Sequence, residues 1–207
     1  MAQRRQPAAT QQQALQQQKL QEKMPPGIDP AVLAGAEEAV RRARAERSDW
    51  HDATAGDHGE SERLRQVADL LGGPKVVGKY PADALAAHEM LQRGLPNTAI
   101  RHLLGGATTL AQKSIENAIG MSVRTRQRRE KHPRELLSQD QTGRTWKFAE
   151  ILTRAISVFG SRTAAEQWLA QPATGLDQRR PIELLTTPAG MELVEDFLGR
   201  VEYGVHT

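Results

Sequence analysis

The chain has 207 residues, a formal net charge of +3 and only 4% aromatic residues, which allows one or two modest domains and argues against a large core. Cysteine is absent, and this excludes disulfides, thiolate metal sites and cysteine nucleophiles. No apolar run approaches the ~20 residues of a membrane span and no signal-peptide apolar region opens the chain, so we expect a cytoplasmic protein without a membrane partner.

Residues 1–60 are predicted to form a polar, low-complexity tail. Glutamine recurs at positions 11–13, 16–18 and 21, and such a stretch offers too little apolar surface to offset the entropy of ordering. Asp29 followed by Pro30 is a helix start, and residues 31–47 are rich in Ala, Glu and Arg, so we expect one solvated helix over 30–47. Its four arginines leave an oligomerisation or DNA-contacting arm as the alternative interpretation.

Residues 61–135 are predicted to form a helical domain. Apolar residues recur at helical spacing in three segments, which end at Gly72-Gly73-Pro74, at Gly94 and at Gly105-Gly106. The apolar residues of these segments are Leu64, Val67, Ala68, Leu71, Leu85, Met90, Leu91, Ile100, Leu103 and Leu104.

A helix-turn-helix is predicted within this domain. Thr109 and Gln112 have the spacing of a capping box, which would open a helix that buries Ala111, Ile115, Ala118 and Ile119. Gly120 follows as a turn, and Ser122 can cap the next helix. Two short helices joined by a tight glycine-containing turn are what this DNA-binding motif requires.

The second helix of this motif is strongly basic. Arginine and lysine dominate residues 121–134, where Glu130 is the only acid, and Arg124, Arg128 and Lys131 share one helical face. Guanidinium groups there can bind phosphates or guanine edges. The predicted DNA-binding residues are Ser122, Arg124, Thr125, Arg126, Arg128, Arg129 and Lys131. The alternative is a solvated basic helix with no nucleic-acid role.

Residues 138–207 are predicted to form a second helical domain. Ser138 and Gln141 form a capping box, and Gly160 stands at the expected end of a helix over Gln139–Phe159. The apolar residues of this segment cover too wide an arc for a surface helix, so we expect it to run through the core. They are Trp146, Ala149, Ile151, Leu152, Ala155, Ile156, Val158 and Phe159.

Three further helices are expected after this core helix. Ser161 can cap a short helix that Pro172 ends, and Pro181 suits the first turn of another. Thr187 and Pro188 open the last helix, whose apolar positions precede a short tail after Gly204. These positions are Met191, Val194, Phe197, Leu198 and Val201.

The order of residues in this second domain is more specific than its periodicity. The ordered run is Phe159-Gly160, Ala165, Trp168-Leu169, Pro172, Leu176, Arg180-Pro181, Leu184-Leu185-Thr186, Gly190, Val194, Leu198, Arg200 and Glu202-Tyr203-Gly204. It resembles the toxin-binding domain of the Xre/MbcA/ParS antitoxins. The resemblance implies one half of a type II toxin–antitoxin pair, whose other half is typically a RES-domain toxin that consumes NAD.

The first domain resembles the same family. The matching residues run from Leu95-Pro96 through Ser122-Val123-Arg124-Thr125 to Arg128-Arg129, and in this family the module implies operator binding. One position departs from the pattern, because Arg126 stands where these antitoxins usually have an apolar residue. Val123 is then the only obvious apolar anchor of the basic helix.

The resemblance places toxin contacts in the C-terminal domain. Arg179, Arg180 and Arg200 could pair with acids of the toxin or stand in for the cationic part of its substrate, and the short tail could fill a concave site. The expected toxin-binding residues are Arg179, Arg180, Pro181, Leu184, Arg200, Tyr203, Gly204, Val205 and His206. The expected partners are the cognate RES-domain toxin, operator DNA and a second copy of the chain, within a larger toxin–antitoxin complex.

The sequence offers no catalytic constellation. The six histidines show neither metal-ligand spacing nor a Ser/His/Asp arrangement, and no phosphate-binding loop occurs. We therefore predict an all-α antitoxin that is not an enzyme and that has no metal or cofactor. The alternative is a helix-turn-helix transcriptional regulator with a ligand-binding or self-associating C-terminal domain, which the identity of the neighbouring reading frame would distinguish.

Overall fold

The computed structural model describes residues 55–203, with side chains for 59–202, and this part of the chain is helical without a β-strand. The predicted all-α class is therefore confirmed. The predicted helix over 30–47 and the tail residues Gly204, Val205 and His206 lie outside the described residues. Among the described helices, none combines the length and the apolarity that a bilayer crossing requires.

The helices begin and end close to the predicted signals. They are α3 Ala55–Leu70, α4 Pro74–Val77, α5 Ala84–Arg93, α6 Asn97–Gly105, α7 Gln112–Ala118, α8 Val123–Glu130, α9 Gln139–Phe159, α10 Arg162–Ala170, the 3₁₀ turn η1 Thr174–Leu176, α11 Pro181–Leu184 and α12 Pro188–Tyr203. Gly160 ends α9 with φ of 78°, a left-handed conformation that glycine adopts without steric cost. The short helix α4 was not predicted, and α3 begins before the predicted Ser61.

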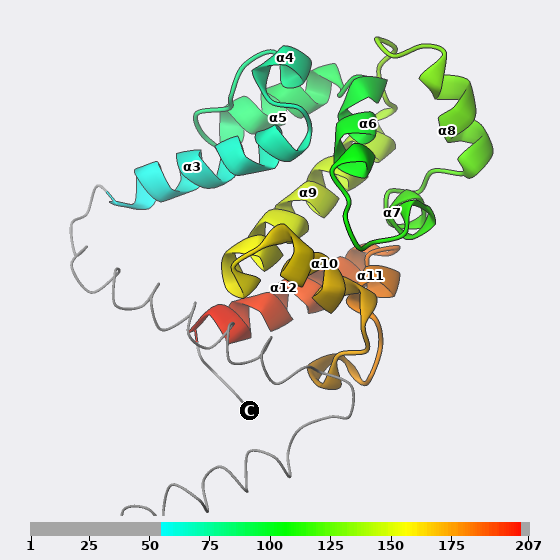
Figure 1. Cartoon of the computed structure of the whole chain (residues 1–207). Helices are drawn as coiled ribbons and strands as arrows, with labels where there is room; N and C mark the ends of the chain where they lie inside the picture. Colours follow the sequence, from blue (N-terminus) through cyan, green and yellow to red (C-terminus); the bar gives the residue numbers. More distant parts are fainter. Residues whose placement is uncertain (1–54, 204–207) are drawn as a thin grey trace, which may run out of the picture. The chain divides into compact units, whose positions relative to one another are not determined.

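Helix α9 lies between α3 and α12 (Figure 1), and it also packs against α5 and α10. Its start is the predicted one, because the Ser138 hydroxyl accepts from the Gln141 backbone N–H at 3.3 Å. Phe148, which the predicted core face omits, is 0% exposed. A helix covered on several sides buries residues outside any single periodic stripe, so the stripe alone underestimates its core.

One hydrophobic cluster extends from Leu64 on α3 to Leu198 on α12. Helix α9 contributes to it along most of its length, including Trp146, Ile151 and Val158. The first half of the described chain and the second half therefore share core residues through α9. The division into domains at residues 61–135 and 138–207 stays a prediction.

The start of α7 differs from the prediction. The helix begins at Gln112 and its N-cap is Ala111, so the predicted capping box at Thr109 is wrong, and Ala111 is exposed where we expected it buried. The rest of the predicted face is confirmed, since Ile115 and Ile119 are buried. The backbone N–H groups before α7 bind a carboxylate from α10 instead of a local side chain.

Candidate functional site

Helices α7 and α8 are joined by a turn at Gly120, whose φ is 69°. The Ser122 hydroxyl caps α8 by accepting from the Thr125 backbone N–H at 3.1 Å. The two hydroxyl oxygens of Ser122 and Thr125 lie 2.8 Å apart, within hydrogen-bond distance. Two predicted DNA-binding residues thus fix the start of the basic helix, because a capped N-terminus does not fray.

Helix α8 is not anchored by apolar burial. None of its described side chains is buried, and the predicted anchor, Val123, is 44% exposed. That part of the prediction is wrong. Since α8 buries no apolar side chain of its own among the described residues, polar contacts must hold the helix against the rest of the protein.

Arg126 provides the first of these contacts. Its Nε donates to Glu116 Oε1 on α7 at 2.5 Å, and its Nη1 makes an ion pair with Glu130. The Glu116 residue is only 2% exposed, and a buried carboxylate needs a cation to offset its lost hydration. The residue that departs from the family pattern therefore docks α8 onto α7 by an ion pair.

Arg129 provides the second contact. Its Nη1 donates to Asn97 Oδ1 at 2.9 Å and lies 3.4 Å from the Leu136 carbonyl oxygen. Asn97 is itself buried and donates from Nδ2 to the His132 carbonyl oxygen at 2.8 Å. Arg129 thereby joins α8 to the N-terminus of α6 and to the loop that follows α8.

The remaining cations of α8, and Lys131 at its C-cap, face outward. Arg124, Arg128 and Lys131 are exposed, and none of them makes an ion pair with another described residue. Unpaired surface cations on one helical face are suited to phosphate oxygens. The five cations among the predicted DNA-binding residues therefore divide into an outward group of three and an inward pair, Arg126 and Arg129.

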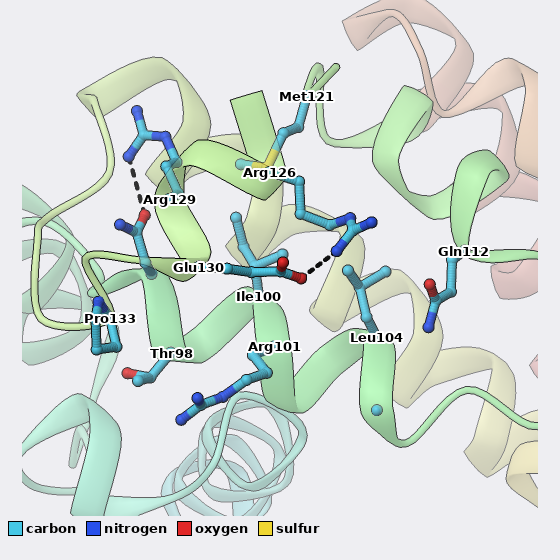
Figure 2. Close-up of a pocket in the computed structure, with 12 residues that line it drawn as sticks. Thr98, Ile100, Arg101, Leu104, Gln112, Met121, Arg126, Arg129, Glu130 and Pro133 are labelled. Atoms are coloured by element: carbon cyan, nitrogen blue, oxygen red, sulfur yellow. Dashed lines mark hydrogen bonds and ion pairs between the residues drawn. The ribbon is translucent and has the colours of Figure 1, made fainter. Parts of the chain in front are cut away.

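A cavity of about 150 Å³ lies between α6 and α8. Its apolar lining includes Ile100, Leu104 and Met121. Arg126 and Glu130, which belong to α8, line it as well (Figure 2). The guanidinium of Arg126 donates to Glu116.

The described toxin-binding candidates lie at α11, including the two residues just before it, and on α12. Arg179 and Arg180 are exposed just before α11, Pro181 is buried in its first turn and Leu184 is partly buried. Arg180 Nη1 lies 3.8 Å from Glu183 Oε1, a surface pair of little energetic weight. Arg200 is exposed on α12, where its guanidinium lies 6.0 Å from the Phe197 ring centroid.

A row of aromatic rings links three helices in this region. Trp168 on α10 lies between Phe159, at a centroid distance of 5.1 Å, and Phe197 on α12, at 5.6 Å. Gly175 lets the Phe197 ring approach the chain, since a Cβ at this glycine would lie 2.3 Å from Cε2 of the ring. The sequence predicted Phe159 and Phe197 as apolar helix positions, whereas the stacking of the three rings depends on how the helices pack.

Glu166 on α10 is a buried polar residue that the sequence analysis missed. It is 0% exposed, and its Oε2 accepts from the backbone N–H groups of Thr108 and Thr109 at 2.7 Å and of Leu110 at 3.3 Å. Burial by itself would raise the pKa of Glu166, but the bonds from Arg162 and from these N–H groups hold the pKa below its ordinary value.

Comparisons with known proteins agree with these features. A family model described as the antitoxin Xre/MbcA/ParS C-terminal toxin-binding domain matches residues 154–204. A protein named Antitoxin Xre from Photorhabdus laumondii is 27% identical over 132 residues, which cover 63% of this chain and 88% of the relative. Proteins of the same name from Yersinia enterocolitica and Pseudomonas putida are 31% identical over 98 residues and 32% identical over 68 residues. These matches cover 47% and 33% of this chain, and 66% and 43% of the respective relatives.

Proposed function

The chain belongs to the Xre/MbcA/ParS family of antitoxins, and from that premise we propose that it occludes a RES-type, NAD-consuming toxin and represses its own operator. Its general role as the antitoxin of a toxin–antitoxin system, with a toxin as partner, follows from the match over residues 154–204 and from the named relatives. The single observation that carries the toxin-binding part of the proposal is this match, because the matching family model is described as a toxin-binding domain.

The toxin is bound by the matched segment. Arg179 and Arg180 support this role, because both cations are exposed beside the short helix α11. A cleft that accepts NAD offers polar partners, and a guanidinium can pair with its acids or take the place of the cationic part of the substrate. The antitoxin therefore acts by blocking access, with no catalytic step or cofactor of its own.

Operator DNA is bound by the outward face of α8. Arg124, Arg128 and Lys131 support this role, because none of the three makes an ion pair with an acidic residue among those that the structure describes. A helix of this length, Val123–Glu130, reaches few base edges. In a homodimer, two copies of α8 therefore bind the two halves of a pseudo-palindromic operator. Binding of the toxin to this homodimer produces a larger complex.

Co-expression with the product of the adjacent reading frame tests the toxin assignment. We expect that product to arrest growth and deplete NAD, and the antitoxin to restore both. Arrest without NAD depletion would reject the RES assignment, and arrest that the antitoxin does not relieve would reject the pairing. A chain without residues 203–207 and the Arg180→Glu variant then separate two modes of occlusion, by the tail or by the body of the domain around α11.

A further inference from the structure

The loop before α7 is held by one carboxylate from the matched segment. Glu166 Oε2 accepts from three consecutive backbone N–H groups and, at 3.0 Å, from the Thr108 hydroxyl. These donors lie more than fifty residues earlier in the chain. Since α7 has no side-chain cap among the described residues, this carboxylate orders the backbone at the start of the helix.

Arg162 makes further contacts that hold this loop. Its Nε donates to Glu166 Oε1 at 2.8 Å, and its Nη2 donates to the Leu103 carbonyl oxygen at the end of α6 at 3.0 Å. Gly106 leaves room for this guanidinium, because a Cβ there would lie 2.4 Å from Nη1. Two residues of α10 therefore hold both ends of the α6–α7 connection.

Helix α7 helps to determine where α8 can lie, together with α6, to which Arg129 joins α8 through Asn97. The ion pair of Arg126 with Glu116 is a direct tie from α8 to α7, and no described side chain of α8 is buried to supply an apolar one. Helix α7 also packs against α11 of the matched segment. A shift of α7 would therefore act on the basic helix through Arg126, and among the described residues only the Arg129 contacts would oppose the movement, since no side chain of α8 is buried.

We infer that Glu166 is a positioning residue for operator binding: from the toxin-binding segment, it sets the place of α7 and thereby of the basic helix α8. The inference rests on the proposed function, in which α8 binds operator DNA. It assigns to α10 a role in DNA binding that the matched segment is not described as having. Glu166 itself is buried and touches no DNA.

The direction of the change in DNA affinity distinguishes a positioning role of Glu166 from a simple effect of its charge. Glu166→Gln removes one negative charge, and a more positive protein binds DNA more tightly when nothing else changes. Loss of the carboxylate also leaves Arg162 facing an amide, and the N–H groups lose their charge-assisted bonds. If Glu166 positions α8, the variant binds more weakly, against the electrostatic trend.

The test measures binding to a labelled duplex from upstream of the chain's own reading frame, over a series of salt concentrations. We expect Glu166→Gln, at a temperature where circular dichroism shows it folded, to bind about tenfold more weakly. We also expect a shallower salt dependence, since fewer cations reach phosphates together. Glu192→Gln is the matched control, because it removes the same charge from an exposed site on α12, and it should bind as tightly as the unaltered chain or slightly more tightly.

Gly106→Ala is a second variant that leaves the net charge unchanged. Gly106 has φ of −86°, which alanine adopts without strain, so the new methyl group displaces the flexible end of Arg162 and little else. We expect operator affinity to fall about threefold, less than for Glu166→Gln, because only the contacts of Arg162 are disturbed and those of Glu166 with the backbone N–H groups remain. This variant decides the question if Glu166→Gln proves unfolded.

The outcomes separate this inference from the proposed function. Failure of the unaltered chain to bind the duplex at low salt would reject the operator-binding proposal and the inference with it. Normal binding by the unaltered chain together with unchanged or tighter binding by folded Glu166→Gln would overturn the inference alone. If that variant is unfolded, unchanged binding by Gly106→Ala overturns it.

Discussion

Helices α8 and α9 are stabilised by different forces. Helix α9 carries a broad apolar surface, and Phe148 near its middle is 0% exposed. Helix α8 has no buried residue among its described side chains, and Arg126 and Arg129 attach it to α7 and α6. The position of the core helix is set by the burial of apolar area, which is not directional. The position of the basic helix is set by a few directional contacts. A strongly basic helix can thus dock without a buried apolar face.

The largest effect is expected from Phe148→Ala in α9. Removing a fully buried phenyl ring leaves a cavity, so the free energy of unfolding should fall by about 4 kcal/mol. Val123→Ala in α8 is the contrasting change, and we expect it to alter the free energy of unfolding by less than about 0.5 kcal/mol. Urea denaturation measures both, and similar losses in the two variants would contradict the comparison.

Reversal of the outward charges of α8 is expected to abolish operator binding. The double variant Arg124→Glu and Arg128→Glu should bind at least about 100-fold more weakly, or about 3 kcal/mol, because attraction to phosphates becomes repulsion. Its thermal transition should stay in place, since both side chains are exposed.

The matched control for this reversal is the double variant Arg179→Glu and Arg180→Glu, which makes the same change in net charge on exposed residues before α11. It should impair inhibition of the toxin and leave operator binding largely intact. Equal loss of operator binding in the two double variants would show that total charge, not the face of α8, governs DNA affinity.

Arg126→Ala tests whether the ion pair docks α8. The change leaves Glu116 buried without its cation, which we expect to lower the free energy of unfolding by about 2 kcal/mol, because the Arg126 side chain is itself partly exposed. Arg128→Ala, on the same helix but exposed, should cost less than about 0.5 kcal/mol. Arg126→Met combined with Glu116→Leu should recover stability, since an apolar pair can replace a buried ion pair.

Acid should loosen the attachment of α7 and α8 before it affects α9. The pKa of Glu166 is lowered from its ordinary value of 4.5, so its ionised form stabilises the folded state above that pH. This contribution is lost as the pH falls through the lowered pKa of the folded state. Hydrogen exchange at Thr109 and Leu110 should accelerate in that range relative to residues of α9, and Glu166→Gln should remove the difference.

Local signals in the sequence were sufficient for most helix boundaries. Ser122, Ser138 and Ser161 each cap the helix that follows them, by accepting from the backbone N–H three residues later. Such a bond depends only on the residues between its two ends, so it can be recognised without the fold. The ordered run from Phe159 to Gly204 likewise indicated the antitoxin family before any packing was known.

Contacts between distant segments had no such signal. Thr109 and Gln112 have the spacing of a capping box, yet the backbone N–H of Thr109 donates to Glu166, which lies 57 residues further along the chain. Nothing in the sequence of the loop indicates this partner. The four arginines between residues 124 and 129 look alike in the sequence. Whether each one faces solvent or pairs with a polar side chain depends on where Glu116 and Asn97 lie, and only tertiary packing decides that.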